Sequence, residues 1–244
     1  DWTYQQDPVE DGFHINLTSF PDDIPEDDVI FAHQLSLMIW NVEGDARVHL
    51  PWGGDVADWQ YGGGDNGYNT LMWEDYTSGS TLGQSRYNFS GDDMIDCDIK
   101  MYGANSYGEK DWSFDYDGAG PDQYDFIHTV IHEIGHCIGF SHSSSSDAIM
   151  YSSNHQGTGW ERRHLHFDDI DGLKAMYGDR TVEIEIDISL GESFPLVIED
   201  EEVELDVELT NVGDGRAYDL VVEIIDPGSR IITPDYPGIV GTLA

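Results

Sequence analysis

The feature that most constrains this chain is a set of residues at the spacing H-E-x-x-H-x-x-G-x-x-H, which consists of His132, Glu133, His136, Gly139 and His142. Residues four apart lie on one face of an α-helix, so the first two histidines can direct their ring nitrogens at a single cation. Glycine accepts a positive φ at little cost, which lets the chain turn and brings the third histidine to the same point. The spacing therefore predicts a helix that carries a metal site.

The donor set indicates which metal this is. Three neutral imidazoles leave one position of a tetrahedral zinc open to water, as in catalytic zinc sites, and zinc lowers the pKa of such a water to about 7. Glu133 directly follows the first ligand and is the candidate general base, which would take the proton of the water and give it to a leaving amine. The alternative is an amphipathic core helix with chance histidines. The composition of the chain puts that coincidence on the order of one in ten thousand.

Two further stretches follow the histidines. The letters A-I-M-Y stand at residues 148–151, and residues 167–178 are typical of a helix that ends at a glycine. The histidine motif resembles that of the metzincin metalloproteases, in which a Met-turn follows it. Within this clan the chain is most similar to the matrixins, which have a comparable closing helix. The resemblance implies that the zinc ligands are His132, His136 and His142, that the general base is Glu133 and that the Met-turn residue is Met150.

The resemblance also implies a fold and an activity. It covers residues 1–178 and implies an α+β metzincin domain, with a twisted mixed sheet, the active-site helix and a small part that carries the Met-turn and the closing helix. The activity implied is that of a secreted, extracellular zinc endopeptidase, which hydrolyses protein substrates by Glu133-assisted attack of zinc-bound water. Substrate would add a strand to the edge strand of the sheet, which we expect near residues 94–101, and residues 151–166 would line the pocket past the scissile bond.

Some features leave alternatives open. An adhesion or binding protein with an inactive metzincin domain is the second hypothesis, although the intact histidines and Glu133 favour the peptidase. Matrixins usually hold a second, structural zinc through histidines in the loop before the zinc helix. Residues 103–123 contain no histidine, so we expect one zinc only. His128 lies one turn before the first ligand and is either a neighbour of the metal or a surface histidine.

A second cation is a further candidate. The stretch D-Y-D-G-A-G at residues 115–120 resembles part of a calcium-binding loop. An EF-hand is excluded, because its twelfth position would be Phe126 and not glutamate. Asp115 and Asp117, together with backbone carbonyls, are therefore candidate ligands for a structural calcium ion.

The charge of the chain excludes one class of partner. There are 49 acidic and 10 basic residues, for a net charge of −39. Nucleic acid binding requires clusters of lysine and arginine, which are missing from this sequence. The acidity fits a halophile-like surface, a set of calcium sites or attraction of basic substrates. No run reaches the ~18 apolar residues of a membrane span, and we expect a monomer that acts on proteins or peptides.

The two cysteines, Cys97 and Cys137, are either free buried thiols or a disulfide. In a secreted protein the disulfide is favoured. It would tie the predicted strand at residues 94–101 to the zinc helix.

Hydrophobic periodicity and turn residues divide the first 178 residues into predicted strands, helices and loops. The segments 51–67 and 103–123 are rich in glycine and aspartate and are predicted loops. The predicted strands are residues 12–17, 46–50, 68–73, 82–87 and 94–101, and the predicted helices are residues 26–42, 124–138 and 167–178.

The composition changes after residue 178. Apolar and acidic residues alternate with period two at 182–190, 202–210 and 220–225, which predicts strands. We therefore expect a separate all-β domain at residues 179–244, which resembles an immunoglobulin-like sandwich. It has roughly 65 residues instead of the usual ~100, so it is either truncated or completed by packing on the catalytic domain.

Overall fold

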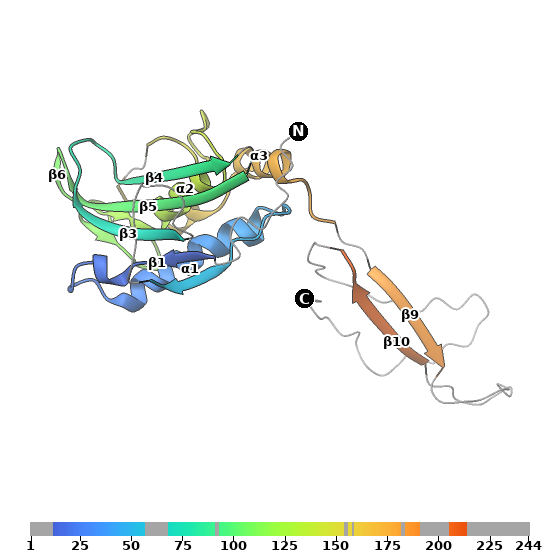
Figure 1. The fold of residues 1–244 in the computed structure, drawn as a ribbon. Coiled ribbons are helices and arrows are strands. Elements are labelled where there is room, and N and C mark those ends of the chain that lie inside the picture. Colours follow the sequence, from blue (N-terminus) through green and yellow to red (C-terminus); the bar gives the residue numbers. More distant parts are fainter. Residues whose placement is uncertain are drawn as a thin grey trace. The chain divides into compact units, whose positions relative to one another are not determined.

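The computed structural model describes residues 12–56, 68–90, 93–153, 156–157, 159–181, 184–190 and 205–213. The chain separates into two compact units, Asp1–Asp179 and Arg180–Ala244. In the first unit a sheet is combined with the helices α1 (Glu26–Glu43), α2 (Phe126–Cys137) and α3 (Phe167–Tyr177) (Figure 1). Helices α1 and α2 pack against each other, and the Trp40 indole N–H of α1 donates a 2.9 Å hydrogen bond to the Ile131 carbonyl of α2.

The sheet of the first unit has the strand order β2-β1-β3-β5-β4, and β6 pairs with the end of β5. Neighbours from β2 to β5 in this order run parallel, and β4 is antiparallel to β5. The sheet is therefore mixed and, with its helices, agrees with the predicted α+β class. The strands are β1 (Phe13–Ile15), β2 (Trp52–Asp55), β3 (Asn69–Tyr76), β4 (Gly83–Ser90), β5 (Asp93–Asn105) and β6 (Gly108–Glu109).

The edge strand beside α2 is β4, and the prediction that residues 94–101 form this edge is wrong. These residues belong to β5, where Ile99 pairs with Leu71 of β3 on one side and with Ser85 of β4 on the other. Strand β5 contributes buried apolar side chains to the core, so its sequence gives the stronger strand signal. The letters of β4, G-Q-S-R-Y-N-F-S, are mostly polar, as is common in a strand with an open edge.

A second prediction that is wrong concerns the strand at residues 46–50. Ala46 makes only an isolated bridge with Asp179, and the strand at this edge of the sheet is β2, in the stretch that we predicted as loop. The letters of β2, W-G-G-D, carry no strand signal. Its conformation comes from parallel pairing with β1, in which Phe13 lies opposite Trp52.

The three predicted helices are confirmed to within two residues. Helix α2 starts at Phe126, because the carboxylate of Asp125 accepts a 3.0 Å hydrogen bond from the His128 N–H and caps the helix. The two residues before it form β8 (Tyr124–Asp125), which pairs with β7 (Trp112–Ser113) inside the segment predicted as loop. Helix α3 ends before Gly178, whose φ is +82°.

The predicted disulfide is confirmed. Cys97 and Cys137 are bonded, with Cα atoms 5.6 Å apart, and both are fully buried. The bridge joins β5 to the last residue of α2. It therefore attaches α2 to an interior strand of the sheet, and not to the edge strand as predicted.

The second unit contains β9 (Ile184–Leu190) and β10 (Leu205–Asn211), which pair antiparallel with Leu205 opposite Leu190. These strands confirm two of the three period-two segments. The third, residues 220–225, lies outside the described residues, and the immunoglobulin-like sandwich stays a prediction. Within the part of the chain that the structure describes, no helix has both the length and the apolarity to cross a membrane.

Candidate active site

The structure brings the three histidines of the motif together. His132 and His136 lie one turn apart on α2, and Gly139, with a φ of +98°, turns the chain so that His142 returns to them. The candidate ligand atoms of the three rings all lie within 4.8 Å of one another. In the described part of the chain this is the one group of three or more histidine, cysteine or acidic side chains placed to share a metal ion.

Two of the rings are oriented by backbone carbonyls. His132 Nδ1 lies 2.7 Å from the Ile149 carbonyl oxygen, and His136 Nδ1 lies 2.8 Å from that of Phe140. A carbonyl oxygen only accepts hydrogen bonds, so each Nδ1 carries the proton and each Nε2 is left with its lone pair. Burial lowers the pKa of His132 to about 3 and also lowers the pKa of His136, so both rings are neutral near pH 7.

This donor set fits zinc. Two nitrogens bound to a tetrahedral zinc at about 2.0–2.1 Å lie roughly 3.3–3.4 Å apart. The Nε2 atoms of His136 and His142 are 3.2 Å apart. Neutral imidazole nitrogens in this arrangement are ligands that zinc prefers, and three of them leave a fourth position free.

The segment predicted as Met-turn lies directly under α2. Met150 is buried, and a Cβ atom added to Gly135 would collide with its sulfur atom, so the missing side chain of Gly135 makes room for it. The carboxylate of Asp169 on α3 accepts hydrogen bonds from the backbone N–H groups of Ile149 at 2.9 Å and Met150 at 3.2 Å. Sequence reasoning predicted the helix at residues 167–178 and missed this contact of Asp169 with the turn.

Glu133 is buried beside the histidines, against the edge strand. The Ser85 hydroxyl of β4 lies 2.6 Å from Glu133 Oε2 and 2.8 Å from the carbonyl oxygen of the same residue. Burial raises the pKa of Glu133 to about 7, and the hydrogen bonds from Ser85 oppose this rise. Sequence reasoning also missed Ser85, because nothing local in a polar strand indicates a partner 48 residues away.

A pocket of about 500 Å³ adjoins these groups. Its walls come from residues 80–85, which lead into β4 and begin it, from α2 and from residues 151–153 after the predicted Met-turn. Residues 151–153 belong to the segment 151–166 that we predicted as the lining of the substrate pocket. Residues 154, 155 and 158 of this segment lie outside the described residues. The lining is rich in hydroxyl groups, which belong to Ser80, Thr81, Ser85, Tyr124, Thr129, Tyr151, Ser152 and Ser153.

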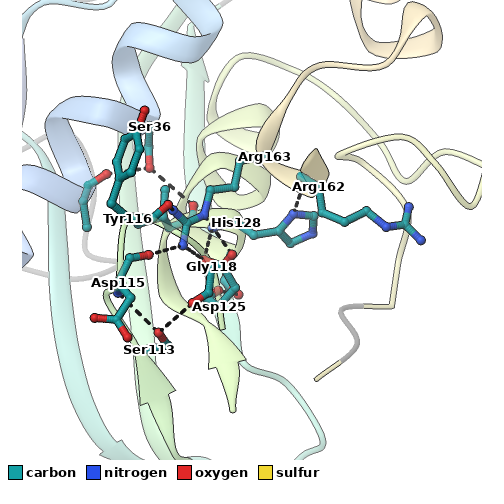
Figure 2. A network of polar contacts seen from close by, with 12 residues as sticks. Ser36, Ser113, Asp115, Tyr116, Gly118, Asp125, His128, Arg162 and Arg163 are labelled. Carbon is teal, nitrogen blue, oxygen red and sulfur yellow. Dashed lines mark hydrogen bonds and ion pairs between the residues drawn. The ribbon is translucent and has the colours of Figure 1, made fainter. Parts of the chain in front are cut away.

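His128 also lines this pocket, so it is a neighbour of the histidine cluster and not a surface residue. Its Nδ1 lies 2.7 Å from the carbonyl oxygen of Arg162, in the segment that follows the Met-turn (Figure 2). Burial lowers the pKa of His128, which favours the neutral ring.

The candidate calcium loop is held by an arginine. Arg163 is fully buried and binds both carboxylate oxygens of Asp125, at 2.8 and 3.0 Å (Figure 2). Its guanidinium also donates to the carbonyl oxygens of Asp115 at 2.7 Å and Tyr116 at 2.8 Å. Two carbonyls of this loop therefore face a side-chain cation. Asp115 and Asp117 join no group of three candidate ligands among the described residues, and calcium there stays a prediction.

The chain is similar to known metalloproteases. Residues 58–178 match the Matrixin family model. Stromelysin-1 of Mus musculus is 23% identical over 184 residues, which cover 70% of this chain and 32% of the relative. Metalloendoproteinase 1 of Glycine max is 44% identical over 55 residues, 22% of this chain and 17% of its own. Matrilysin of Homo sapiens is 38% identical over 56 residues, 23% of this chain and 21% of its own. The chain thus spans a third or less of the length of these relatives.

Proposed function

We propose that residues 58–178, which match the Matrixin family model, are a matrixin-like metalloprotease domain, and that the chain is a zinc-dependent endopeptidase that hydrolyses peptide bonds in proteins. The observation that carries the proposal is the meeting of three imidazoles and one buried carboxylate at a single pocket. An inactive, purely adhesive domain has no need of this combination. The adhesion hypothesis is therefore second.

The proposed roles follow from the geometry. The Nε2 atoms of His132, His136 and His142 would hold the metal. Bound zinc supplies a Lewis acid that polarises a carbonyl and acidifies water. Glu133 accepts a proton from the water and passes it to the leaving amine, which a group with a pKa near neutrality does well in both directions. Met150 is the apolar floor beneath the histidines.

Strand β4, which among the described strands pairs only with β5, is the proposed substrate-binding strand. An extended peptide can pair with a free sheet edge through its backbone, which makes binding largely independent of sequence. The start of β4 lines the pocket beside Glu133. A peptide paired there would carry its scissile bond past the carboxylate and would direct a side chain into the pocket.

His128 narrows the class of side chain that this pocket would take. Its Nδ1 is occupied by the Arg162 carbonyl, so the other nitrogen of the neutral ring is an acceptor. Covering an acceptor with an aliphatic group costs about 1–3 kcal/mol. We expect the pocket to favour substrate side chains that end in a hydrogen-bond donor, such as glutamine or lysine.

The disulfide supports the proposal of a secreted, extracellular enzyme, because such bonds persist in oxidising compartments. For the second unit, residues 180–244, we propose a role in adhesion or spacing, supported by the antiparallel pair β9 and β10.

The test is hydrolysis of casein and of a mixed peptide library, with and without a zinc chelator, by wild type and by Glu133→Gln. We expect one zinc per chain in both proteins and cleavage only by zinc-loaded wild type. Wild type that holds one zinc and cleaves nothing would reject the peptidase and leave the adhesion hypothesis.

A further inference from the structure

The buried carboxylate of Glu133 lies in a recess of the edge strand β4. Alternate residues of a strand share one face, so Gly83 and Ser85 both face the zinc helix. A Cβ atom at Gly83 would lie 2.8 Å from Glu133 Cγ and 2.9 Å from Oε1, which is too close. The missing side chain of Gly83 thus leaves space for the carboxylate, and the hydroxyl of Ser85 binds it from the next position on the same face.

The Ser85 hydroxyl lies within hydrogen-bond distance of two oxygen atoms of Glu133. Its Oγ is 2.6 Å from Glu133 Oε2 and 2.8 Å from the Glu133 carbonyl oxygen. A hydroxyl has one proton to donate and two lone pairs. When Glu133 is a carboxylate, Ser85 can donate to Oε2. When the carboxyl group carries a proton, it can donate to Ser85 Oγ, and the serine proton can turn to the carbonyl oxygen.

We propose that Ser85 is a positioning residue that holds the carboxyl group of Glu133 in one place before and after it accepts a proton. The inference rests on the proposed peptidase function, in which Glu133 is the general base. Ser85 acts through Glu133 and needs no contact with the substrate. A general base depends on such fixation, because a displacement of about 1 Å can cost up to a hundredfold in rate.

The first experiment compares kinetic constants of wild type, Ser85→Ala, Ser85→Thr and the control Ser106→Ala. Ser106 is a serine of the turn after β5 whose hydroxyl donates to the Ser78 carbonyl, away from the histidines. We expect Ser85→Ala to lower kcat about tenfold with KM within about twofold of wild type. Threonine keeps the hydroxyl and is favoured in strands, so Ser85→Thr should recover most of kcat.

The second experiment needs no activity. In zinc-free protein, a double-mutant cycle combines Ser85→Ala with Glu133→Ala and measures the thermal midpoint. We expect Ser85→Ala to lower the midpoint by a few degrees when Glu133 is present and to have little effect when it is absent. If the two substitutions lower the midpoint additively, Ser85 and Glu133 are not energetically coupled and the inference is overturned.

The outcomes separate this inference from the proposed function. If wild type cleaves no peptide, the peptidase proposal fails and the positioning role fails with it, whereas the cycle in zinc-free protein still decides the contact. If wild type is active and Ser85→Ala keeps its full kcat, Ser85 is only structural and the inference is overturned. The inference is supported if Ser85→Ala lowers kcat, if Ser85→Thr restores it, and if the double-mutant cycle shows that Ser85 and Glu133 are coupled in stability.

Discussion

The carboxylate of Asp169 accepts a hydrogen bond from the backbone N–H of Met150 and so ties the closing helix to the turn beneath the histidines. The same carboxylate accepts a 2.9 Å bond from the N–H of Ile149, whose carbonyl in turn orients His132. A third N–H, that of His166, donates to it at the start of α3. One buried side chain therefore links α3, the predicted Met-turn and a candidate zinc ligand.

Asp169→Ala should destabilise the first unit and weaken zinc binding. Three N–H groups lose their acceptor, which we expect to lower the free energy of unfolding by about 3 kcal/mol. Denaturant unfolding and a zinc competition assay measure the two effects. Asp171→Ala, on the exposed side of the same helix, is the matched control. Equal stability of the two variants would contradict the role of Asp169.

His128→Leu should change the substrate preference of the pocket. Wild type should cleave peptides with glutamine or lysine just past the scissile bond faster than those with leucine. In His128→Leu the peptides with leucine should be cleaved faster, because the buried acceptor is gone. The ratio of kcat/KM for the two kinds of peptide should change by about tenfold. Matched peptide pairs measure the ratio, and His49→Leu, at an exposed position, is the control. A ratio that stays the same in His128→Leu would rule this out.

His33 should make the first unit sensitive to acid. It is fully buried on α1 against Trp52, and burial, with a smaller contribution from His14, lowers its pKa from 6.5 to about 3. Below pH 6.5 the unfolded chain gains a proton at this residue that the folded chain does not, so stability falls as the pH falls toward 3. His33→Leu should reduce the loss of stability between pH 7 and about pH 4.

Chemical unfolding at several pH values gives the change of the free energy of unfolding with pH for wild type, for His33→Leu and for the exposed control His49→Gln. The control should follow wild type. An identical slope in all three proteins would show that His33 does not contribute.

The disulfide between Cys97 and Cys137 should stabilise the zinc site together with the sheet. It closes a separation of 40 residues, and we expect its removal to cost about 2–4 kcal/mol. The variant with both cysteines changed to alanine should melt at a lower temperature and bind zinc less tightly, because Cys137 directly follows His136. Calorimetry with and without reductant tests this. Reductant that leaves wild-type melting and activity unchanged, under conditions that break the bond, argues against it.

Salt should stabilise the chain if its acidity is an adaptation to brine. With a net charge of −39, self-repulsion is strong at millimolar salt and is screened at molar salt. We expect the melting temperature to rise over that range in both sodium and potassium chloride. A melting temperature that falls would reject the halophile-like interpretation.

Much of the candidate site could be predicted from local spacing. His132 and His136 converge because a helix returns to the same face after four residues, and His142 follows through the turn that Gly139 allows. The helices at 26–43, 126–137 and 167–177 were predicted within two residues by periodicity and glycine signals. These features depend on interactions between residues close in sequence, which a sequence displays directly.

Tertiary structure alone decided the surroundings of the site. Polar β4 is the edge strand and the more apolar β5 is internal. Local sequence could not show this order, because each strand pairs with partners up to dozens of residues away. The bonds of Ser85 to Glu133, of Asp169 to Met150 and of Arg163 to Asp125 span 48, 19 and 38 residues. No periodicity encodes them, since each forms only when separate elements pack together. The sequence by itself determined which residues are the candidate zinc ligands and the candidate general base, and only the packing decided which side chains hold them in place.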